Sequence, residues 1–332
     1  VGNLPGWGSR SAAYWRRRGR RVKRARVSEL YCGDAAEVLK TLPEKSINMC
    51  VTSPPYYGLR DYGKNVRLGR ESTPEGYIED LVKVFDEVYR VLMDDGTLWL
   101  NIGDTYAHKP YAKVKPKDLI GIPWMLAFAL RERGWHLRSD IIWRKTNAMP
   151  EGVKDRPAHC YEHLFLLAKS PHYFFDYHAL ERPIAAETEA RYQRNRSESS
   201  KYFTSKYGQG LEKHLGKVTE KCRQFCRGRD VWDIGTNGYR MREHFAMFPE
   251  KLVEPCILAG SRKGDVVLDP FIGSGTTGAV AKRLDRECVA IDIDPLYVER
   301  ARARIAAVEP ETPQGNAAGK LRKPQENAAE ER

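Results

Sequence analysis

The sequence of 332 residues has no long apolar run: no stretch of about 18 consecutive apolar residues occurs, so a membrane-spanning helix is not expected. The first residues also lack the apolar segment of a secretory signal. Seven cysteines are present, and they lack the regular spacing of a disulfide framework, which favours free thiols in a reducing compartment. We therefore expect a cytoplasmic protein that has no membrane partner.

Acidic residues are missing from residues 1–28, which contain nine Lys and Arg residues. The formal net charge of the whole chain is +12, and residues 186–230 contribute eleven basic against six acidic residues. Positive charge is thus gathered in one terminal arm and one internal segment, as in proteins that bind a polyanion. Two other interpretations remain open: a basic surface that is merely solvated and, for residues 1–28, an organellar transit peptide.

Strand and helix patterns alternate over residues 29–178 and again over 241–308, which is typical of an α/β domain. Residues 179–240 lose this apolar rhythm and are polar, basic and dotted with tyrosine, which indicates an insertion. Residues 309–332 are polar without periodicity, and we expect a disordered tail. The expected strands are Glu29–Cys32, Ile47–Thr52, Thr97–Ile102, Asp140–Trp143, His163–Ala168 and Cys288–Asp292, and the expected helices are Ala35–Leu42, Ile78–Leu92, Ile122–Arg133 and Tyr297–Val308.

Two motifs follow apolar strands in this chain. The first is Thr52-Ser53-Pro54-Pro55-Tyr56, and the second, about 200 residues later, is Asp269-Pro270-Phe271-Ile272-Gly273-Ser274-Gly275-Thr276-Thr277. Together and in this order they resemble the circularly permuted beta group of DNA amino-methyltransferases, in which the catalytic tetrapeptide precedes the cofactor loop. The resemblance covers approximately residues 29–305.

The resemblance implies a seven-stranded, mostly parallel, Rossmann-like sheet that is circularly permuted, with helices on both faces and one antiparallel hairpin strand. Residues 29–178 would form its catalytic half, 179–240 an inserted target-recognition region and 241–308 its cofactor half. The implied activity is methyl transfer from S-adenosyl-L-methionine (SAM) to the 4-amino group of cytosine in duplex DNA, after base flipping. Alternatives are transfer to the 6-amino group of adenine, methylation of RNA or of a glutamine amide, and a catalytically silent SAM-fold DNA-binding protein.

The second motif is typical of a strand, a tight glycine turn and a helix start. Glycines let the backbone approach a ligand, and a helix N-terminus offers N–H groups to a carboxylate such as that of SAM. Asp269 is expected to complement the ammonium group of SAM, and Asp292, about 20 residues later, to bind the ribose. Asp34 either reads the adenine ring or is an ordinary N-cap. The loop glycines also fit a dinucleotide site, but the Asp-Pro-Phe before them matches the methyltransferase loop. The expected cofactor residues are Asp34, Phe245, Pro249, Asp269, Pro270, Phe271, Gly273, Ser274, Gly275, Thr276 and Asp292.

The first motif provides hydrogen-bond acceptors for a base amine. Such an amine is a poor nucleophile because its lone pair is conjugated with the ring, and two acceptors aimed at its N–H groups draw the nitrogen toward tetrahedral geometry. Ser53 Oγ and the Pro54 carbonyl are adjacent acceptors, and Pro54 and Pro55 stiffen the turn. Tyr56 offers a ring on which a flipped base can stack. In the family that the chain resembles, Ser-Pro-Pro-Tyr is associated with cytosine, whereas Asp or Asn at the first position is associated with adenine.

Basic residues are the candidates for contact with duplex DNA. Arginine and lysine neutralise phosphates, and arginine can also read guanine in the major groove. We expect residues 1–28 to be a flexible arm that touches DNA phosphates. Enzymes of this kind usually occur in prokaryotes or their phages, often with a cognate restriction endonuclease, and either a monomer or a homodimer is compatible with the sequence. The candidate DNA-binding residues are Arg60, Arg191, Arg194, Arg196, Lys201, Lys206, Arg223, Arg227 and Arg229.

Three other features are assigned more ordinary roles. Cys256 follows a proline, as does the nucleophile of cytosine ring-carbon methyltransferases, but its apolar helical surroundings favour a buried thiol. Cys222 and Cys226, with His214 nearby, have too loose a spacing for a zinc site, so no metal is expected. Trp143 either lines the base pocket or belongs to the core.

Overall fold

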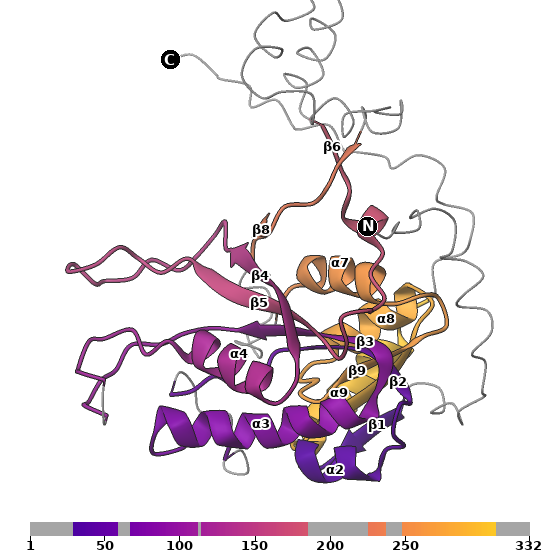
Figure 1. The fold of residues 1–332 in the computed structure, drawn as a ribbon, viewed down its shortest axis with the longest axis horizontal. Helices are drawn as coiled ribbons and strands as arrows, with labels where there is room; N and C mark the ends of the chain where they lie inside the picture. The colour runs from indigo at the N-terminus through magenta and orange to yellow at the C-terminus, as the bar shows by residue number, and fades with distance from the viewer. Residues whose placement is uncertain (1–28, 59–66, 112–113, 185–224, 237–247, 310–332) are drawn as a thin grey trace, which may run out of the picture.

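The computed structural model describes residues 29–58, 67–111, 114–184, 225–236 and 248–309. Strands and helices alternate along these segments and build one large sheet with helices on both faces, which confirms the predicted α/β fold (Figure 1). No helix among these residues has the length and apolarity needed to cross a membrane. The elements are β1 (Glu29–Cys32), α2 (Ala35–Thr41), β2 (Ile47–Thr52), α3 (Pro74–Val91), β3 (Leu92–Ile102), α4 (Ile122–Glu132), β4 (His136–Arg144), β5 (Tyr161–Ala168), η1 (Tyr177–Leu180), β6 (Arg182–Pro183), β7 (Phe225–Cys226), β8 (Val231–Asp233), α7 (Glu250–Gly260), β9 (Val266–Asp269), α8 (Thr276–Arg283), β10 (Glu287–Asp292) and α9 (Pro295–Ala306).

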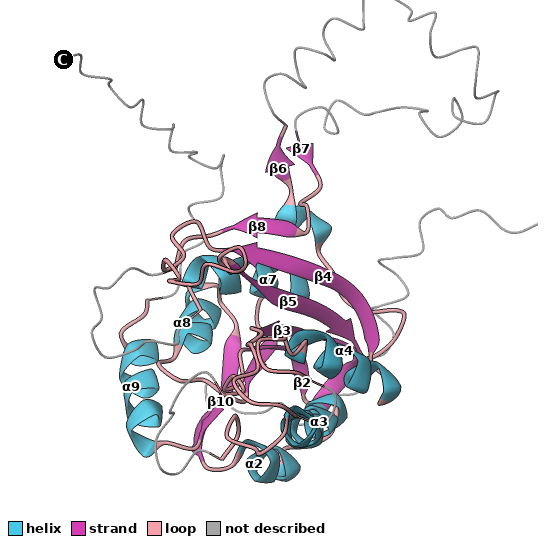
Figure 2. Ribbon diagram, turned by 90° about the vertical axis from the view of Figure 1, so that its left-hand side faces the viewer, coloured by secondary structure: helices cyan, strands magenta, loops and turns pink. Residues whose placement is uncertain are grey.

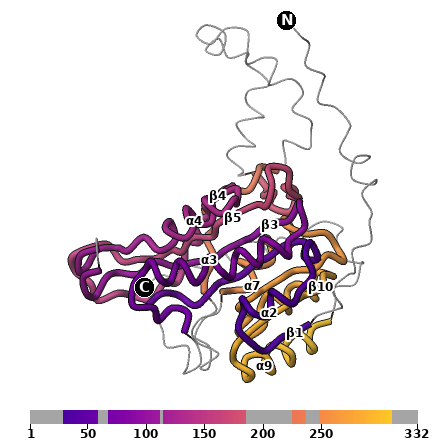
Figure 3. Tube along the Cα trace, turned by 60° about the horizontal axis from the view of Figure 1, so that its bottom comes forward, coloured from indigo at the N-terminus to yellow at the C-terminus, as the bar shows by residue number. Residues whose placement is uncertain are grey.

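The large sheet has the strand order β1-β10-β9-β2-β3-β5-β4-β8. β5 runs antiparallel to both of its neighbours, and the other pairs are parallel, as a mostly parallel sheet with one hairpin strand requires. β1 and β10, the first and last strands among the described residues, lie side by side (Figure 3). Strands from the two ends of the described part of the chain therefore lie together at one edge of the sheet.

The sheet has eight strands and not the expected seven, because β8 joins its edge. β8 lies within residues 179–240, the segment expected to be an insertion, and pairs in parallel with β4 (Ile142↔Val231). The side chain of Trp232 in the middle of β8 is buried between two exposed neighbours. This three-residue strand covers backbone groups at the β4 edge that would otherwise need other partners.

The helices form two layers. Buried side chains of α2, α3 and α4 pack with one face of the sheet, and those of α7 and α8, with Ala301 of α9, pack with the other (Figure 1). α3 shows why the layers form: Leu81, Phe85 and Val88 recur at helical spacing and are fully buried. α3 begins at Pro74 and not at the expected Ile78, because Thr73 caps it by accepting a hydrogen bond from the Gly76 amide (3.2 Å).

The neighbours β2 and β9 mark a reversal in the sheet order. From β2 the chain passes through α3 to β3 on one side, and from β9 it passes through α8 to β10 on the other. Figure 2 labels β2, α3 and β3, as well as α8 and β10. The two strands pair directly, with Met49 opposite Val267 and Cys50 opposite Leu268. Open α/β sheets bind ligands outside the carboxyl ends of the strands at such a point. Both motifs singled out in the sequence begin there.

Candidate active site

A buried carboxylate joins the two motifs. Thr52 Oγ1, at the end of β2, donates a hydrogen bond to Asp269 Oδ1 at 2.6 Å, and Thr277 Oγ1 donates to Asp269 Oδ2 at 2.6 Å. The Phe271 amide donates to Oδ1 at 3.0 Å. Because Ser53 follows Thr52 directly, this carboxylate fixes the tetrapeptide Ser53–Tyr56 next to the start of the glycine loop.

The position of Asp269 differs from the one expected. Its side chain was expected to face the ammonium group of SAM, but it has no exposed surface, and both of its oxygens accept hydrogen bonds from the chain itself. Burial raises the pKa of this carboxyl to about 6, against the lowering effect of the bonds from Thr277, Thr52 and the Phe271 amide. Asp269 is therefore a brace between the two motifs.

The glycine loop leaves room on one side and is tightly packed on the other. Gly273 (φ 51°) and Gly275 (φ 87°) both have the left-handed backbone that favours glycine. A Cβ on Gly273 would meet no atom within 4 Å, whereas one on Gly275 would lie 2.8 Å from Ala301 Cα in α9. Gly275 is also the N-cap of α8 and gives that helix no side-chain cap, so its first amides can serve a ligand.

Asp292 and Asp34 lie at neighbouring strand ends beside this loop. Asp292 Oδ2 accepts a hydrogen bond from the Gly273 amide (2.9 Å), and its backbone carbonyl accepts one from the Gly33 amide (2.9 Å). Burial raises the pKa of the Asp292 carboxyl. Asp34 is exposed and caps α2 by accepting from the Glu37 amide at 3.1 Å, so the predicted N-cap role is confirmed.

Arg304, which the sequence did not single out, holds the loop from α9. Its guanidinium donates to Thr276 Oγ1 at 3.0 Å and to Glu250 Oε1 at 2.7 Å. The same group reaches Ser274 Oγ at 3.4 Å. The side chains of Ser274 and Thr276 are buried, so these two expected cofactor residues bind part of the protein itself. An arginine within an amphipathic helix carries no local sign of such a contact.

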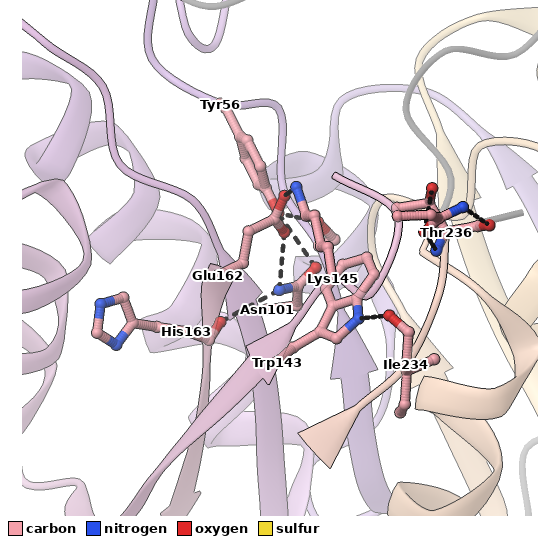
Figure 4. A network of polar contacts seen from close by, with 10 residues as sticks. Tyr56, Asn101, Trp143, Lys145, Glu162, His163, Ile234 and Thr236 are labelled. Atoms are coloured by element: carbon pink, nitrogen blue, oxygen red, sulfur yellow. Dashed lines mark hydrogen bonds and ion pairs between the residues drawn. The ribbon is translucent and has the colours of Figure 1, made fainter. Parts of the chain in front are cut away.

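Tyr56 of the tetrapeptide is held by side chains from β3 and β5 (Figure 4). Its hydroxyl lies 3.2 Å from Ser53 Oγ, 3.1 Å from Asn101 Oδ1 and 2.6 Å from Glu162 Oε2. The ring fits against Gly103, where a Cβ would lie 2.8 Å from Tyr56 Cε2. Asn101 and Glu162 were not predicted, although each is a polar residue next to the buried apolar part of its strand.

Trp143 and Cys256 belong to the core. The Trp143 side chain is buried with the α7 residues, and its indole N–H donates to the Ile234 carbonyl at 2.9 Å, which supports the core alternative. Cys256 is fully buried within α7, and burial raises the pKa of its thiol well above the ordinary value. The expected buried thiol is confirmed.

The remaining candidates divide between described and undescribed parts of the chain. Arg227 and Arg229 are exposed beside β7, and the Arg227 guanidinium carbon lies 5.5 Å from the centre of the Tyr177 ring. Pro249 is buried at the start of α7, and Pro270 and Phe271 begin the glycine loop. Outside the described residues lie Arg60, Arg191, Arg194, Arg196, Lys201, Lys206, Arg223 and Phe245, together with Cys222 and His214 of the zinc alternative.

Solved structures of DNA methylases share this architecture. PvuII DNA methyltransferase, which is cytosine-N4-specific, gives a TM-score of 0.60 at 20% identity, covering 85% of this chain and 87% of that one. TTHA0409 from Thermus thermophilus, assigned as a DNA modification methylase and complexed with SAM, gives a TM-score of 0.55 at 26% identity, covering 84% and 93%. The first of these likenesses supports the fold alone.

Sequence relatives identify the family. Type II methyltransferase M.Cfr9I of Citrobacter freundii is 43% identical over 297 residues, which cover 83% of this chain and 87% of that protein. Type II methyltransferase M.SmaI of Serratia marcescens is 41% identical over 301 residues, which cover 84% and 91%. The model of the DNA methylase family matches residues 47–303. This chain therefore belongs to the DNA methylase family of N6- and N4-methyltransferases.

Proposed function

We propose that this DNA methyltransferase transfers the methyl group of SAM to the exocyclic 4-amino group of a cytosine in duplex DNA, at a short specific sequence and after base flipping. The observation that carries the proposal is the bond between Thr52 and Asp269, because it fixes the tetrapeptide that binds the amine beside the loop that binds the methyl donor. The two parts meet at the reversal of the sheet order, where ligands of such folds bind.

The residues around the glycine loop suit SAM. The open space in front of Gly273 admits a ligand, and the uncapped N-terminus of α8 suits the ligand's carboxylate. Asp292 and Asp34 provide acceptors for the ribose and the adenine ring at the ends of β10 and β1. SAM supplies an electrophilic methyl group on a cationic sulfur.

The tetrapeptide positions the amine that receives this methyl group. Ser53 Oγ and the Pro54 carbonyl accept hydrogen bonds from the two amine N–H groups, so that the nitrogen lone pair points toward the methyl donor. Tyr56 stacks on the flipped base, and the hydroxyl contacts to Asn101 and Glu162 hold its ring. Fixed dipoles need no reorganisation as charge moves, so they lower the barrier efficiently.

Cytosine is favoured over adenine by Ser53. A neutral hydroxyl at the first position of the tetrapeptide resembles the cytosine-directed members of the family, whereas adenine-directed members have Asp or Asn there. The basic segments at 1–28 and 186–230 supply charge for the DNA backbone, and a cognate endonuclease remains a proposed partner.

The activity can be tested with labelled SAM and duplex DNA that contains many short sequences, followed by enzymatic digestion and mass spectrometry of the nucleosides. We expect label in N4-methylcytosine. Label in N6-methyladenine would overturn the choice of base but keep the amine chemistry, and absence of label from the DNA nucleosides would overturn the DNA substrate. A Ser53→Ala protein serves as the control for contaminating activity.

A further inference from the structure

The Tyr56 side chain belongs to a hydrogen-bonded network that includes Glu162 and Lys145 (Figure 4). Ser53 Oγ lies 3.2 Å from the Tyr56 hydroxyl, and that hydroxyl lies 2.6 Å from Glu162 Oε2. The other carboxylate oxygen of Glu162 binds Lys145 Nζ at 2.5 Å. The side chain of Glu162 is only 12% exposed and that of Lys145 is 24% exposed, so this end of the hydrogen-bonded network is largely shielded from water.

The protons that these groups carry decide which group donates and which accepts in each hydrogen bond of the network. Tyr56 has one hydroxyl proton, and Glu162 Oε2 is a nearer and charged acceptor than Asn101 Oδ1, which lies 3.1 Å away. The Asn101 amide donates to Glu162 Oε2 and to the His163 carbonyl, both at 3.1 Å. Ser53 therefore donates to Tyr56, and the oxygen lone pairs of Ser53 are available to a base amine. Each bond polarises the next, which strengthens Ser53 as an acceptor.

The reversed direction of β5 brings Glu162 to this place. β5 is antiparallel to β3 and β4, so its first residues lie at the carboxyl ends of the parallel strands. Glu162 stands opposite Trp143 near the end of β4, and Lys145 follows that strand. The Glu162 carboxylate and the Lys145 ammonium group thus lie at the carboxyl ends of the parallel strands, where the two motifs meet.

We propose that Glu162 is a positioning residue that acts through Tyr56 and Ser53 and is the final acceptor of the proton that the amine loses. This inference rests on the proposed methylation of a base amine. As the nitrogen lone pair forms the new N–C bond, the electrons of one N–H bond return to nitrogen and its proton passes to Ser53 Oγ. The Ser53 proton moves to the Tyr56 oxygen, and the Tyr56 proton moves to Glu162 Oε2.

The relay prevents positive charge from remaining on the methylated nitrogen in a site shielded from water, where an unpaired charge is costly. After transfer, Glu162 is a neutral carboxylic acid beside an ammonium group. The proton then passes from Glu162 to water, and the original hydrogen bonds are restored. No oxidant, reductant or further reactant is needed.

The test compares single-turnover rates of methyl transfer at saturating SAM and DNA in the full-length protein. Glu162→Gln keeps the size of the side chain and removes the base, and Tyr56→Phe keeps the ring and removes the hydroxyl that links the relay. Asp140→Asn is the matched control, because Asp140 is a carboxylate on the adjacent strand that binds His163 and not Tyr56. Equilibrium affinities for SAM and for duplex DNA are measured in each protein, so that a binding defect is separated from a transfer defect.

We expect Glu162→Gln and Tyr56→Phe each to slow transfer by about 100-fold, with affinities within about threefold of the wild type, and Asp140→Asn to keep the wild-type rate. The double variant should be no slower than either single variant, since the residues act as one unit. Added formate should restore transfer in a Glu162→Ala protein, whereas chloride at the same ionic strength should not; a purely structural role for Glu162 predicts no such rescue.

A Glu162→Gln protein with the wild-type rate, a loss matched by Asp140→Asn, or additive losses in the double variant would each overturn the relay. The nucleoside that carries the methyl group in the wild-type reaction tests the proposed function separately, because the relay serves cytosine and adenine amines alike. Absence of any DNA methylation by the wild type would overturn both proposals.

Discussion

At the residue scale, the sequence predicted the groups that we propose act on the amine, but not the side chains that contact them. Ser53 and Tyr56 stand in a motif whose chemistry can be read locally. Glu162 and Arg304 are a glutamate near the start of a strand and an arginine in a helix, and nothing in their neighbourhood along the chain indicates their contacts. Their roles arise from strand order and helix packing, which bring them to the site from distant positions.

Ser53 and Asp292 should give opposite defects. Ser53→Ala removes an acceptor that acts on the reacting amine, so turnover should fall by about 100- to 1000-fold while SAM affinity is kept. Asp292→Ala removes the proposed ribose acceptor and the partner of the Gly273 amide, so the dissociation constant for SAM should rise by about 10- to 100-fold. Calorimetric SAM titration and single-turnover kinetics measure both quantities; weakened SAM binding in Ser53→Ala would contradict its assignment to the amine.

Asp269 should make stability depend on pH. Burial raises its pKa from 3.8 to about 6, so between these values the native protein keeps a proton that the unfolded chain has lost. This group's contribution therefore favours the folded state at low pH and is lost as pH rises through about 6. Relative to Asp269→Asn, the wild type should lose about 2 kcal/mol of unfolding free energy between about pH 4.5 and about pH 7.5. Urea unfolding of both proteins at the two pH values measures this difference, and parallel behaviour would mean that Asp269 does not titrate in this range.

At the scale of elements, the spacing of apolar residues predicted most of the strands and helices. The differences between the expected and the observed elements have identifiable causes. α3 starts at Pro74 and not at Ile78 because Thr73 caps the helix and Pro74 suits its first turn. β8 could not be recognised, because a strand of three residues has too little alternation to show a period. It exists because the edge of β4 accepts it and because Trp232 finds a buried site.

The two turn glycines should respond differently to alanine. Both have positive φ, so each change strains the backbone by about 1–2 kcal/mol. Gly275→Ala also forces a Cβ to within 2.8 Å of Ala301 Cα, so its unfolding free energy should fall further, by about 1–3 kcal/mol. Gly273→Ala projects into open space and should mainly weaken SAM binding. Thermal unfolding with and without SAM separates the effects, and equal stability losses would show that α9 does not pack tightly on the loop.

At the scale of the whole molecule, the folded core and the positively charged segments have different proposed roles. The α/β core positions the chemistry, whereas much of the positive charge lies in residues 1–28 and 186–230. Electrostatic attraction to phosphates does not require a particular sequence of bases and weakens steeply with salt. Base readout must come from side chains positioned over the grooves.

Removal of residues 1–28 should weaken DNA binding by about 10-fold at low salt and by much less at high salt, because fewer counterions are released. The slope of log affinity against log salt concentration should become shallower, while SAM affinity and the nucleoside that is methylated stay the same. Fluorescence anisotropy with labelled duplexes over a salt series measures the slope. An unchanged slope would mean that the nine basic residues of the arm do not contact DNA.

The sequence by itself determined the α/β class and the family, because these depend on residue type and on order along the chain; the acceptors of the tetrapeptide and the ligand contacts of the glycine loop are its predictions. Only the tertiary structure decided that Asp269 is a buried brace, that β8 completes the sheet edge and that Glu162 lies behind Tyr56. The physical reason is that hydrogen bonds such as Thr52 to Asp269 join residues 217 positions apart, and no local pattern records a distance in space.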